Sequence, residues 1–443
     1  MSQFQLLKKK KFYPIFWTMF SGAFNDNFFK NALIILINYK AQQVMGIAPA
    51  QMVALAGGIF ILPFFLFSAT SGQIADKFEK TKIISVIKFV EILIMCLAFA
   101  GFFYEQFVFL LAVLFLMGTH SAFFGPVKYS ILPQHLKDDE MMAGNALVEA
   151  GTFLAILLGT ICGGILINLE SNASLYVSIG LLLVALLGFW MSRKISTTPA
   201  VDSTIKIEWN PVTPTYKVYQ LAKKNTSVFF SIYAISWFWF FGAVILSLFP
   251  IYCKDILNAG PPIVTFFLAL FSVGIGVGSL LCERIAGKKV DLSLVVLGTL
   301  GMSFFTAELY FTGVPHQVST AVGTFLGFEA FFLQESSYRI SFDLFMMSVF
   351  SGFFIVPLYT LMQVRTNPAI RSRIIAANNV LNALFMVVAA VGLMQLLKHQ
   401  LNVPQIFLTI SILNIIFMAF IFAKEPEFLM SGRARLKALF LRA

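Results

Sequence analysis

Two stretches of the sequence match each other without a gap. AGNALVEAGTFLAILLG at 143–159 aligns with AANNVLNALFMVVAAVG at 376–392. The alignment superposes three informative pairs of residues, which are Asn145 with Asn378, Glu149 with Asn382, and Gly159 with Gly392. Both stretches are mainly apolar and neither alternates with a period of two, so each is typical of a helix and not of a strand. The recurrence of one helical segment in the two parts of the chain indicates an internal repeat.

Two further matches occur in the same order along the chain. FWTMFSGAF at 16–24 resembles SWFWFFGAV at 236–244, and ADKFEKTK at 75–82 resembles CERIAGKK at 282–289. These matches pair Trp17 with Trp237, Asp76 with Glu283 and Lys77 with Arg284. Any one match is weak, but three matches in the same order indicate that the chain arose by duplication.

The composition is that of an integral membrane protein. Of 443 residues, 58% are hydrophobic and only 12% are charged, and Phe alone occurs 51 times. Soluble domains are about 45–50% apolar and about a quarter charged. A chain of this composition has too little polar surface to cover a water-soluble globule. A soluble enzyme, a disulfide scaffold and a disordered chain are therefore excluded.

Twelve apolar runs are long enough to cross the hydrocarbon core, for which about 20 residues suffice. They lie at 12–39, 51–75, 82–103, 106–124, 141–168, 174–191, 228–252, 261–282, 291–311, 341–363, 374–397 and 403–423. The sequence thus predicts an all-α membrane protein with 12 transmembrane helices in two pseudo-symmetric six-helix halves. The expected parts are a first half at 1–192, a cytoplasmic linker at 193–225, a second half at 226–424 with an outer interfacial segment at 312–340, and a basic amphipathic cytoplasmic tail at 425–443.

The net charge of +11 is explained by topology. With the N-terminus inside, 26 of the 32 Lys and Arg residues fall in inner loops and tails. Outer loops hold only Lys40, Lys254, Arg339 and Lys398. Because cytoplasmic loops collect basic residues, both termini are predicted to be cytoplasmic. The excess charge therefore gives no reason to expect nucleic acid as a partner.

A few ionisable groups remain inside the predicted spans, where charge is costly and is a sign of function. Asp26 lies mid-span, and its partner is either Lys30, one turn on, or Lys128 at the end of the fourth span. Asn145 and Glu149 form a polar stripe, as do their repeat partners Asn378 and Asn382. The two stripes are expected to line one central cavity; the alternative is hydrogen bonding that holds helices together.

Two features of the spans have a less specific interpretation. Trp237 opens the seventh span among Phe residues, and its repeat match to Trp17 favours an inward-facing indole. Lys88 and Glu91 in the third span are three residues apart, so they are able to pair. Lys88 lies near the cytoplasmic end of its span, and we expect it to extend toward the membrane surface.

The stretch GQIADKFEKTK at 72–82 resembles the signature loop of the major facilitator superfamily. Gly72, Ala75 and Asp76 fit that pattern, whereas Glu79 replaces the usual Gly. The resemblance implies a gating latch at the cytoplasmic ends of the helices. The residues to which it assigns gating are Asp76, Lys77 and Lys80, with Glu283 and Arg284 as repeat counterparts. The alternative is that these cations only follow the positive-inside pattern.

A narrower resemblance covers nearly the whole chain. Among the stretches that carry it are GAFNDNFFKNALIILI (22–37), GPVKYSILPQHL (125–136), FIVPLYTLMQ (354–363) and RSRIIAANNVLNALFMVV (371–388). They are similar to bacterial lysophospholipid transporters, above all to the transporter domain that is fused in many proteins to a lysophospholipid acyltransferase and an acyl–carrier-protein ligase. The resemblance implies flipping of lysophosphatidylethanolamine-like lipids across the bacterial inner membrane to the cytoplasmic leaflet, where they are reacylated.

Several expectations follow from this resemblance. The chain ends at Ala443 and has no acyltransferase motif, so we expect a monomeric, non-enzymatic transporter without a cofactor, and any acyltransferase is a separate chain. The coupling ion, proton or sodium, stays open, and membrane lipids are the other expected partners. The expected substrate and transport residues are Asp26, Asn27, Lys30, Lys128, Tyr129, Asn145, Glu149, Trp237, Asn378 and Asn382.

Two other functions compete with this one. An exporter of drugs or amphipathic metabolites would have the same fold, and the sequence does not exclude a different substrate. A membrane anchor that recruits an acyltransferase is less compatible with Asp26 and Glu149, because an anchor has no need of charge within the membrane.

Overall fold

The chain folds almost entirely into α-helices. The computed structural model describes residues 3–40, 49–169, 171–210, 212–287, 289–313 and 325–431. Within these ranges the β-structure is limited to one isolated bridge, between Ala259 and Leu326. Eleven described helices are long and apolar enough to cross a membrane. A further 28-residue helix, α1, carries Asp26 and Lys30. The predicted all-α membrane fold is confirmed, and its twelve spans are consistent with these helices.

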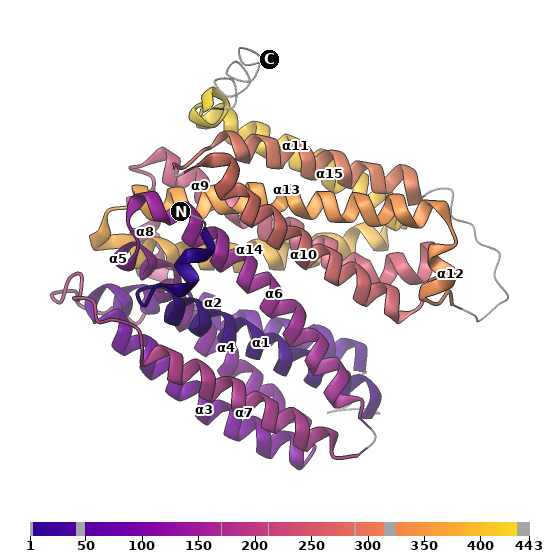
Figure 1. Cartoon of the computed structure of the whole chain (residues 1–443), viewed down its shortest axis with the longest axis horizontal. Helices are drawn as coiled ribbons and strands as arrows, with labels where there is room; N and C mark the ends of the chain where they lie inside the picture. The colour runs from indigo at the N-terminus through magenta and orange to yellow at the C-terminus, as the bar shows by residue number, and fades with distance from the viewer. Residues whose placement is uncertain are drawn as a thin grey trace. The chain divides into compact units, whose positions relative to one another are not determined.

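The long helices follow the predicted spans closely (Figure 1). The first six are α1 (Tyr13–Lys40), α2 (Pro49–Lys77), α3 (Lys80–Phe103), α4 (Phe107–Ser130), α6 (Met141–Ile167) and α7 (Ala173–Ser192). The second six are α9 (Thr226–Ile251), α10 (Pro261–Ala286), α11 (Ser293–Gly313), α13 (Glu335–Arg365), α14 (Arg371–Lys398) and α15 (Val403–Lys424). The clearest differences are α4, which continues to Ser130, and α13, which begins at Glu335 and not at 341.

Short elements connect these helices. Between the long helices lie α5 (Leu132–His135), η2 (Asp138–Glu140), α8 (Val212–Ala222), η3 (Tyr252–Ile256), α12 (Phe328–Phe332) and η4 (Pro368–Ile370), and η1 (Gln3–Lys8) precedes α1. The predicted interfacial segment at 312–340 lies partly outside the described residues. The same holds for the predicted tail, of which the basic residues Arg433, Arg435, Lys437 and Arg442 are not described.

The chain divides into two compact units. The first contains Met1–Lys224 together with Gln363–Ala383, and the second contains Asn225–Met362 and Leu384–Ala443. The end of α13 and the first half of α14 therefore belong to the first unit. As a result Asn145 and Glu149 lie in the same unit as their repeat partners Asn378 and Asn382.

Helix pairs form the first unit. The most extensive contacts are those of α1 with α6, α2 with α4, and α3 with α7, and these pairs lie side by side in Figure 1. In the second unit α15 packs on α11 and α9, and α9 packs on α10. An apolar core between α1, α3, α4 and α7 is built from buried side chains such as Phe29, Met95, Phe102 and Leu181.

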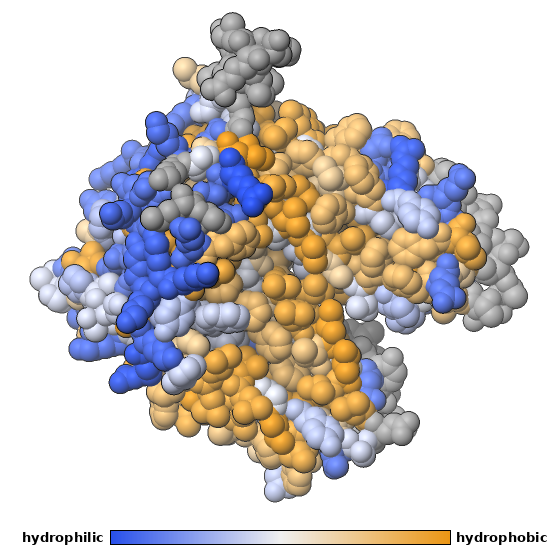
Figure 2. All heavy atoms as spheres, in the orientation of Figure 1, coloured by the Kyte–Doolittle hydropathy of each residue, from blue (hydrophilic) through white to orange (hydrophobic). Residues whose placement is uncertain are grey.

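The linker adds a polar region to one end of the first unit. Its residues lead from α7 to the short helix α8, and the backbone of Glu208 is held by Gln73 of α2. Figure 2 shows hydrophilic residues gathered at this end, around α5 and α8. The sides of the helices are largely hydrophobic, as expected of surfaces in contact with lipid.

Candidate functional site

Asp26 lies on α1 and faces α4. One carboxylate oxygen accepts a hydrogen bond from the hydroxyl of Ser121 at 2.7 Å. The other oxygen is buried and has no hydrogen-bond partner among the described residues. Among the described residues, Asp26 forms no ion pair with Lys30 or with Lys128, the two lysines expected as its partner. Lys30 has its ammonium over the ring of Phe60, 5.6 Å from the centroid, and Lys128 is engaged elsewhere.

Lys128 and Glu149 form a second polar group between α4 and α6. The ammonium of Lys128 donates to the hydroxyl of Thr152 at 3.0 Å, and the hydroxyl of Tyr129 donates to Glu149 at 2.9 Å. Lys128 interacts electrostatically with both Glu149 and Asp26. Glu149 is 1% exposed, whereas Asp26 and Lys128 are partly accessible. The first unit therefore contains a cation that interacts electrostatically with two acids of its helical region.

The two repeat-related asparagines have different surroundings. Asn145 on α6 and Gln363 at the end of α13 exchange two hydrogen bonds, at 2.8 and 3.1 Å, and both side chains are fully buried. Asn378 on α14 is also fully buried, but its amide oxygen and nitrogen find no partner among the described residues. Because unpaired buried amides are costly, a ligand that forms hydrogen bonds with Asn378 would be favourable.

The remaining expected residues are mostly engaged in packing. Asn27 donates to the Ala23 carbonyl of its own helix at 2.8 Å, and Asn382 on α14 is 6% exposed. Trp237 is buried in the second unit, where its indole nitrogen donates to Asn414 at 2.7 Å. Its ring stacks on Phe417 at a centroid distance of 4.3 Å. Trp17, its repeat match, is by contrast 40% exposed.

A buried cluster around Glu91 lies beside Asp26. One oxygen of Glu91 accepts from Lys88 at 2.6 Å and lies 3.2 Å from a ring nitrogen of His120. The other oxygen accepts from Asn25 at 2.9 Å. Lys88 is fully buried, so the expectation that it extends to the membrane surface is wrong. Its ammonium instead points inward, next to Gly22 and 5.1 Å from the ring centroid of Phe124.

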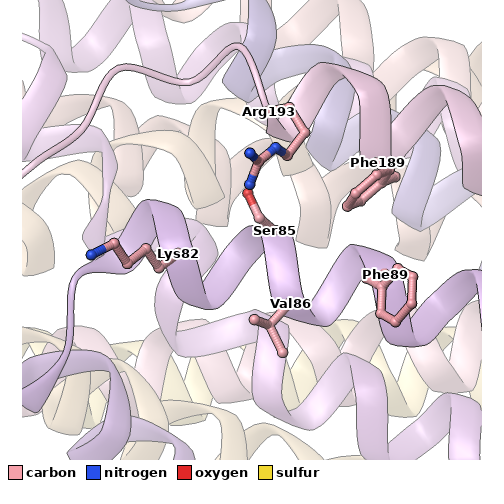
Figure 3. A pocket seen from close by; sticks show the side chains of 6 residues that line it. All are labelled: Lys82, Ser85, Val86, Phe89, Phe189 and Arg193. Carbon is pink, nitrogen blue, oxygen red and sulfur yellow. The ribbon is translucent and has the colours of Figure 1, made fainter.

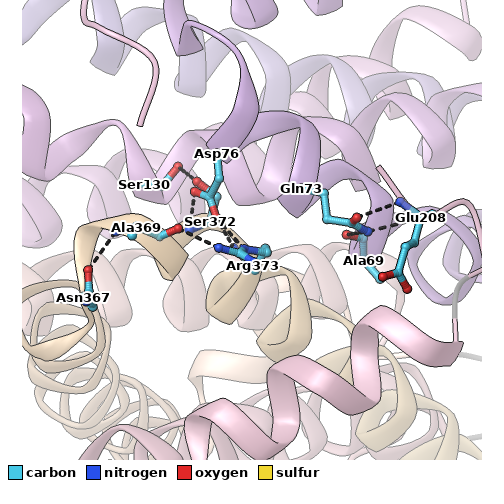
Figure 4. A network of polar contacts seen from close by, with 9 residues as sticks. All are labelled: Ala69, Gln73, Asp76, Ser130, Glu208, Asn367, Ala369, Ser372 and Arg373. Atoms are coloured by element: carbon cyan, nitrogen blue, oxygen red, sulfur yellow. Dashed lines mark hydrogen bonds and ion pairs between the residues drawn. The ribbon is translucent and has the colours of Figure 1, made fainter. Parts of the chain in front are cut away.

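The predicted latch residue Asp76 is bound to the start of α14 (Figure 4). One oxygen accepts from the backbone amide of Ser372 at 3.1 Å, and the other accepts from the side chain of Arg373 at 3.1 Å. Free amides in the first turn of a helix favour an anion, which explains why the carboxylate docks there. The hydroxyl of Ser372 also donates to Ser130 at the end of α4, at 2.9 Å.

The other predicted gating residues do not form one cluster. Lys80 is almost fully buried and interacts electrostatically with Asp76. Lys77 has its ammonium 5.6 Å from the ring centroid of Phe78. In the second unit, neither Glu283 nor Arg284 has an ion pair or hydrogen bond within the described parts of the chain. Among the predicted gating residues that the structure describes, only Asp76 binds the start of a neighbouring helix as a latch would.

Several residues of these sites were missed from the sequence. The sequence pattern does not identify Ser121, His120 and Asn25 as partners of the intramembrane acids, and it marks Arg373 only as an inner-loop cation. Gln363 ends the apolar stretch FIVPLYTLMQ, which carries the family resemblance. A polar residue at the end of an apolar run indicates a candidate site residue.

Comparison with known proteins agrees with the fold. Residues 15–390 match the model of the Major Facilitator Superfamily. The lysophospholipid transporter LplT of Serratia proteamaculans (strain 568) is 25% identical over 367 residues, 81% of this chain and 81% of that protein. LplT of Klebsiella pneumoniae (strain 342) is 27% identical over 368 residues, again 81% of each chain.

Solved structures share the fold at low sequence identity. The human organic anion transporter MFSD10 superposes with a TM-score of 0.72 at 11% identity, over 93% of this chain and 99% of that one. The transporter FucP in the outward conformation gives a TM-score of 0.68 at 11% identity, over 93% and 98%. Since the family model covers most of the sequence and carries the Asp76 loop and both polar stripes within its bounds, the chain belongs to the Major Facilitator Superfamily.

Proposed function

We propose that this chain is a secondary transporter that moves lysophospholipids, of the lysophosphatidylethanolamine type, across the bacterial inner membrane. Transport delivers them by alternating access to the cytoplasmic leaflet, where a separate acyltransferase reacylates them. The chain acts as a monomer with both termini in the cytoplasm. Curated relatives that span 81% of the sequence are named lysophospholipid transporters, which supports this choice of substrate.

The observation that supports the proposal is that Lys128 interacts electrostatically with both Asp26 and Glu149. A lysophosphatidylethanolamine headgroup has a phosphate and an ammonium, so it needs both a cation and an acid. Lys128 supplies a cation for the phosphate, and Asp26 is a partly accessible acid for the ammonium. The orphaned oxygen of Asp26 is available for that contact.

The acyl chain contributes affinity but little selectivity. Each buried methylene gains about 0.8 kcal/mol in any apolar surrounding, including the bilayer that the lipid leaves. Discrimination between lipids therefore depends on the headgroup contacts. Loss of either charge at the site is expected to affect transport more than loss of an apolar wall residue.

The test is uptake of labelled lysophosphatidylethanolamine in proteoliposomes. Asp26→Asn and Lys128→Ala are each expected to abolish uptake while the purified protein keeps its elution profile and thermal unfolding temperature. Lys254→Gln, a matched change in an outer loop, is expected to keep the wild-type rate. Wild-type rates for both site variants would contradict the proposed site.

A competition assay tests the substrate class. Unlabelled lysophosphatidylethanolamine is expected to compete, whereas amphipathic drugs of similar size are not. Equal competition by both would favour the exporter of drugs or amphipathic metabolites. The same vesicles, with an imposed pH gradient or sodium gradient, identify the coupling ion, proton or sodium, or show that the lipid gradient suffices.

A further inference from the structure

A cavity of about 350 Å³ opens between α3 and α7 at the end of the first unit where α3 begins and α7 ends. Its lining consists of Lys82, Ser85, Val86, Phe89, Phe189 and Arg193 (Figure 3). None of these residues belongs to the sites described above. In the predicted orientation this end faces the cytoplasm, so the cavity lies at the level of the inner leaflet.

The cavity has a cationic end and an apolar end. Figure 3 shows the guanidinium of Arg193 directed toward the hydroxyl of Ser85, with Lys82 one turn away on α3. Phe89 and Phe189 form the apolar end, with ring centroids 6.0 Å apart. Val86 and Phe89 are 62% and 51% exposed, which is unusual for large apolar groups unless lipid covers them.

The charges around the cavity are not balanced. Lys82 is paired with Glu79 at 3.3 Å, and Glu79 also accepts from the hydroxyl of Thr81. Arg193 forms no ion pair among the described residues, and the neighbouring Lys194 lies over the ring of Trp190 at 3.2 Å from its centroid. Three cations against one acid leave an excess of positive charge beside an apolar surface.

We propose that this cavity binds an anionic two-chain phospholipid from the surrounding leaflet. Its phosphate would contact Arg193, Ser85 and Lys82, and one acyl chain would lie along Val86, Phe89 and Phe189. Basic pockets between helices at the cytoplasmic side are a known form of anionic headgroup recognition. A zwitterionic lipid would leave the excess positive charge uncompensated. This site is independent of the proposed transport activity.

The neighbouring Trp190 provides a local probe of occupancy. It is 54% exposed on the same end of α7 as Phe189 and Arg193. The purified full chain is reconstituted in vesicles of phosphatidylcholine that contain either brominated phosphatidylglycerol or brominated phosphatidylcholine at equal total bromine. The signal from Trp190 is the difference between the fluorescence of the wild type and of Trp190→Phe. Bromine quenches only nearby indoles, so this difference reports lipid beside the end of α7 that borders the cavity.

We expect brominated phosphatidylglycerol to quench Trp190 at a much lower mole fraction than brominated phosphatidylcholine. Two basic residues near an anionic headgroup correspond to roughly a thirtyfold preference. The double variant Lys82→Gln and Arg193→Gln is expected to lose most of this preference. The control double variant, Lys223→Gln with Lys224→Gln, removes the same amount of charge from the linker. It is expected to retain the preference for phosphatidylglycerol. Thermal unfolding in detergent verifies that both double variants are folded.

Three results would overturn the proposal. The first is equal quenching of Trp190 by the two brominated lipids. The second is an equal loss of preference in both double variants, which would indicate diffuse attraction of anionic lipid to this end of the protein. The third is displacement of brominated phosphatidylglycerol by a small molar amount of lysophosphatidylethanolamine, which would assign the cavity to the transported substrate. A failure of transport in the separate uptake assay leaves these outcomes unchanged.

Discussion

At the scale of single residues, the buried acids differ in how fully they are satisfied. Glu91 pairs with Lys88, accepts a hydrogen bond from Asn25 and lies close to a ring nitrogen of His120. Its charge is therefore compensated within the helical region. Asp26 lies on α1, next in sequence to Asn25; it accepts one hydrogen bond, from Ser121, and its other oxygen has no partner in the described structure. The first arrangement suits a fixed structural anchor, and the second suits a group that binds a ligand.

Replacement of Lys88 by Met tests the structural role of the Glu91 cluster. The variant leaves a fully buried carboxylate without its closest cation, which costs about 3–5 kcal/mol in comparable pairs. Lys88→Met combined with Glu91→Gln is expected to regain part of this loss, because a neutral amide oxygen still accepts from Asn25. Urea unfolding in detergent measures the free energy of unfolding of the single and the double variant. Lys82→Met, which removes an exposed lysine of the same helix, is the control. An unchanged stability of the single variant would contradict the cluster's role.

Asp76 and its repeat partner Glu283 allow a matched test of the latch. Asp76→Asn weakens charge-assisted hydrogen bonds to the start of α14, each worth about 1.5–3 kcal/mol. We expect the uptake rate to fall at least about tenfold, since 1.4 kcal/mol corresponds to a factor of ten. Glu283→Gln removes the same charge from a side chain without a partner in the described structure, so uptake should persist. Equal effects of the two variants would refute the latch.

At the scale of helices, glycine decides how closely two elements approach. A Cβ atom at Gly159 of α6 would lie 2.3 Å from the Phe24 carbonyl oxygen of α1, a backbone atom that cannot move aside alone. Among the residues that the structure describes, no atom lies within 4 Å of the corresponding position at its repeat partner Gly392. Gly159 is therefore required for a close helix contact in the first unit, whereas Gly392 makes no such contact with the described residues of the second unit.

This contrast predicts opposite effects of the same substitution. Gly159→Ala is expected to destabilise the first unit by about 1–3 kcal/mol, as other overpacked cores do. Gly392→Ala is expected to be neutral or to stabilise α14, because Ala is favoured over Gly in a helix by about 1 kcal/mol. Unfolding in urea or SDS provides the comparison, and destabilisation by both variants to the same extent would exclude a specific α1–α6 contact.

At the scale of the whole molecule, the basic residues predict the orientation in the membrane. Cysteine labelling tests it in a background in which Cys96, Cys162, Cys253 and Cys282 are replaced by Ser. In intact cells a membrane-impermeant maleimide is expected to label Lys254→Cys and Lys398→Cys. It should label Lys224→Cys only after the cells are opened. The reverse pattern would show that the positive-inside assignment is inverted.

Most of the fold was predictable because a transmembrane span is a local property. Some 20 consecutive apolar residues suffice to identify one, and no distant contact is needed to decide it. The observed helix ends therefore fall close to the predicted ends for most of the spans. The exceptions have local causes: α4 includes the polar Lys128–Ser130 stretch, and α13 includes the charged Glu335–Arg339 stretch, which hydropathy assigns to loops.

The sequence alone determined the helical class, the spans, the repeat and the presence of rare charges within the membrane. The partners of those charges follow from the three-dimensional packing: Ser121 for Asp26, Thr152 for Lys128, and Ser372 with Arg373 for Asp76. It also placed Lys88 inside and not at the membrane surface. The physical reason is that a partner depends on how each helix is rotated and how closely it packs, and these are set by contacts between residues far apart in the chain.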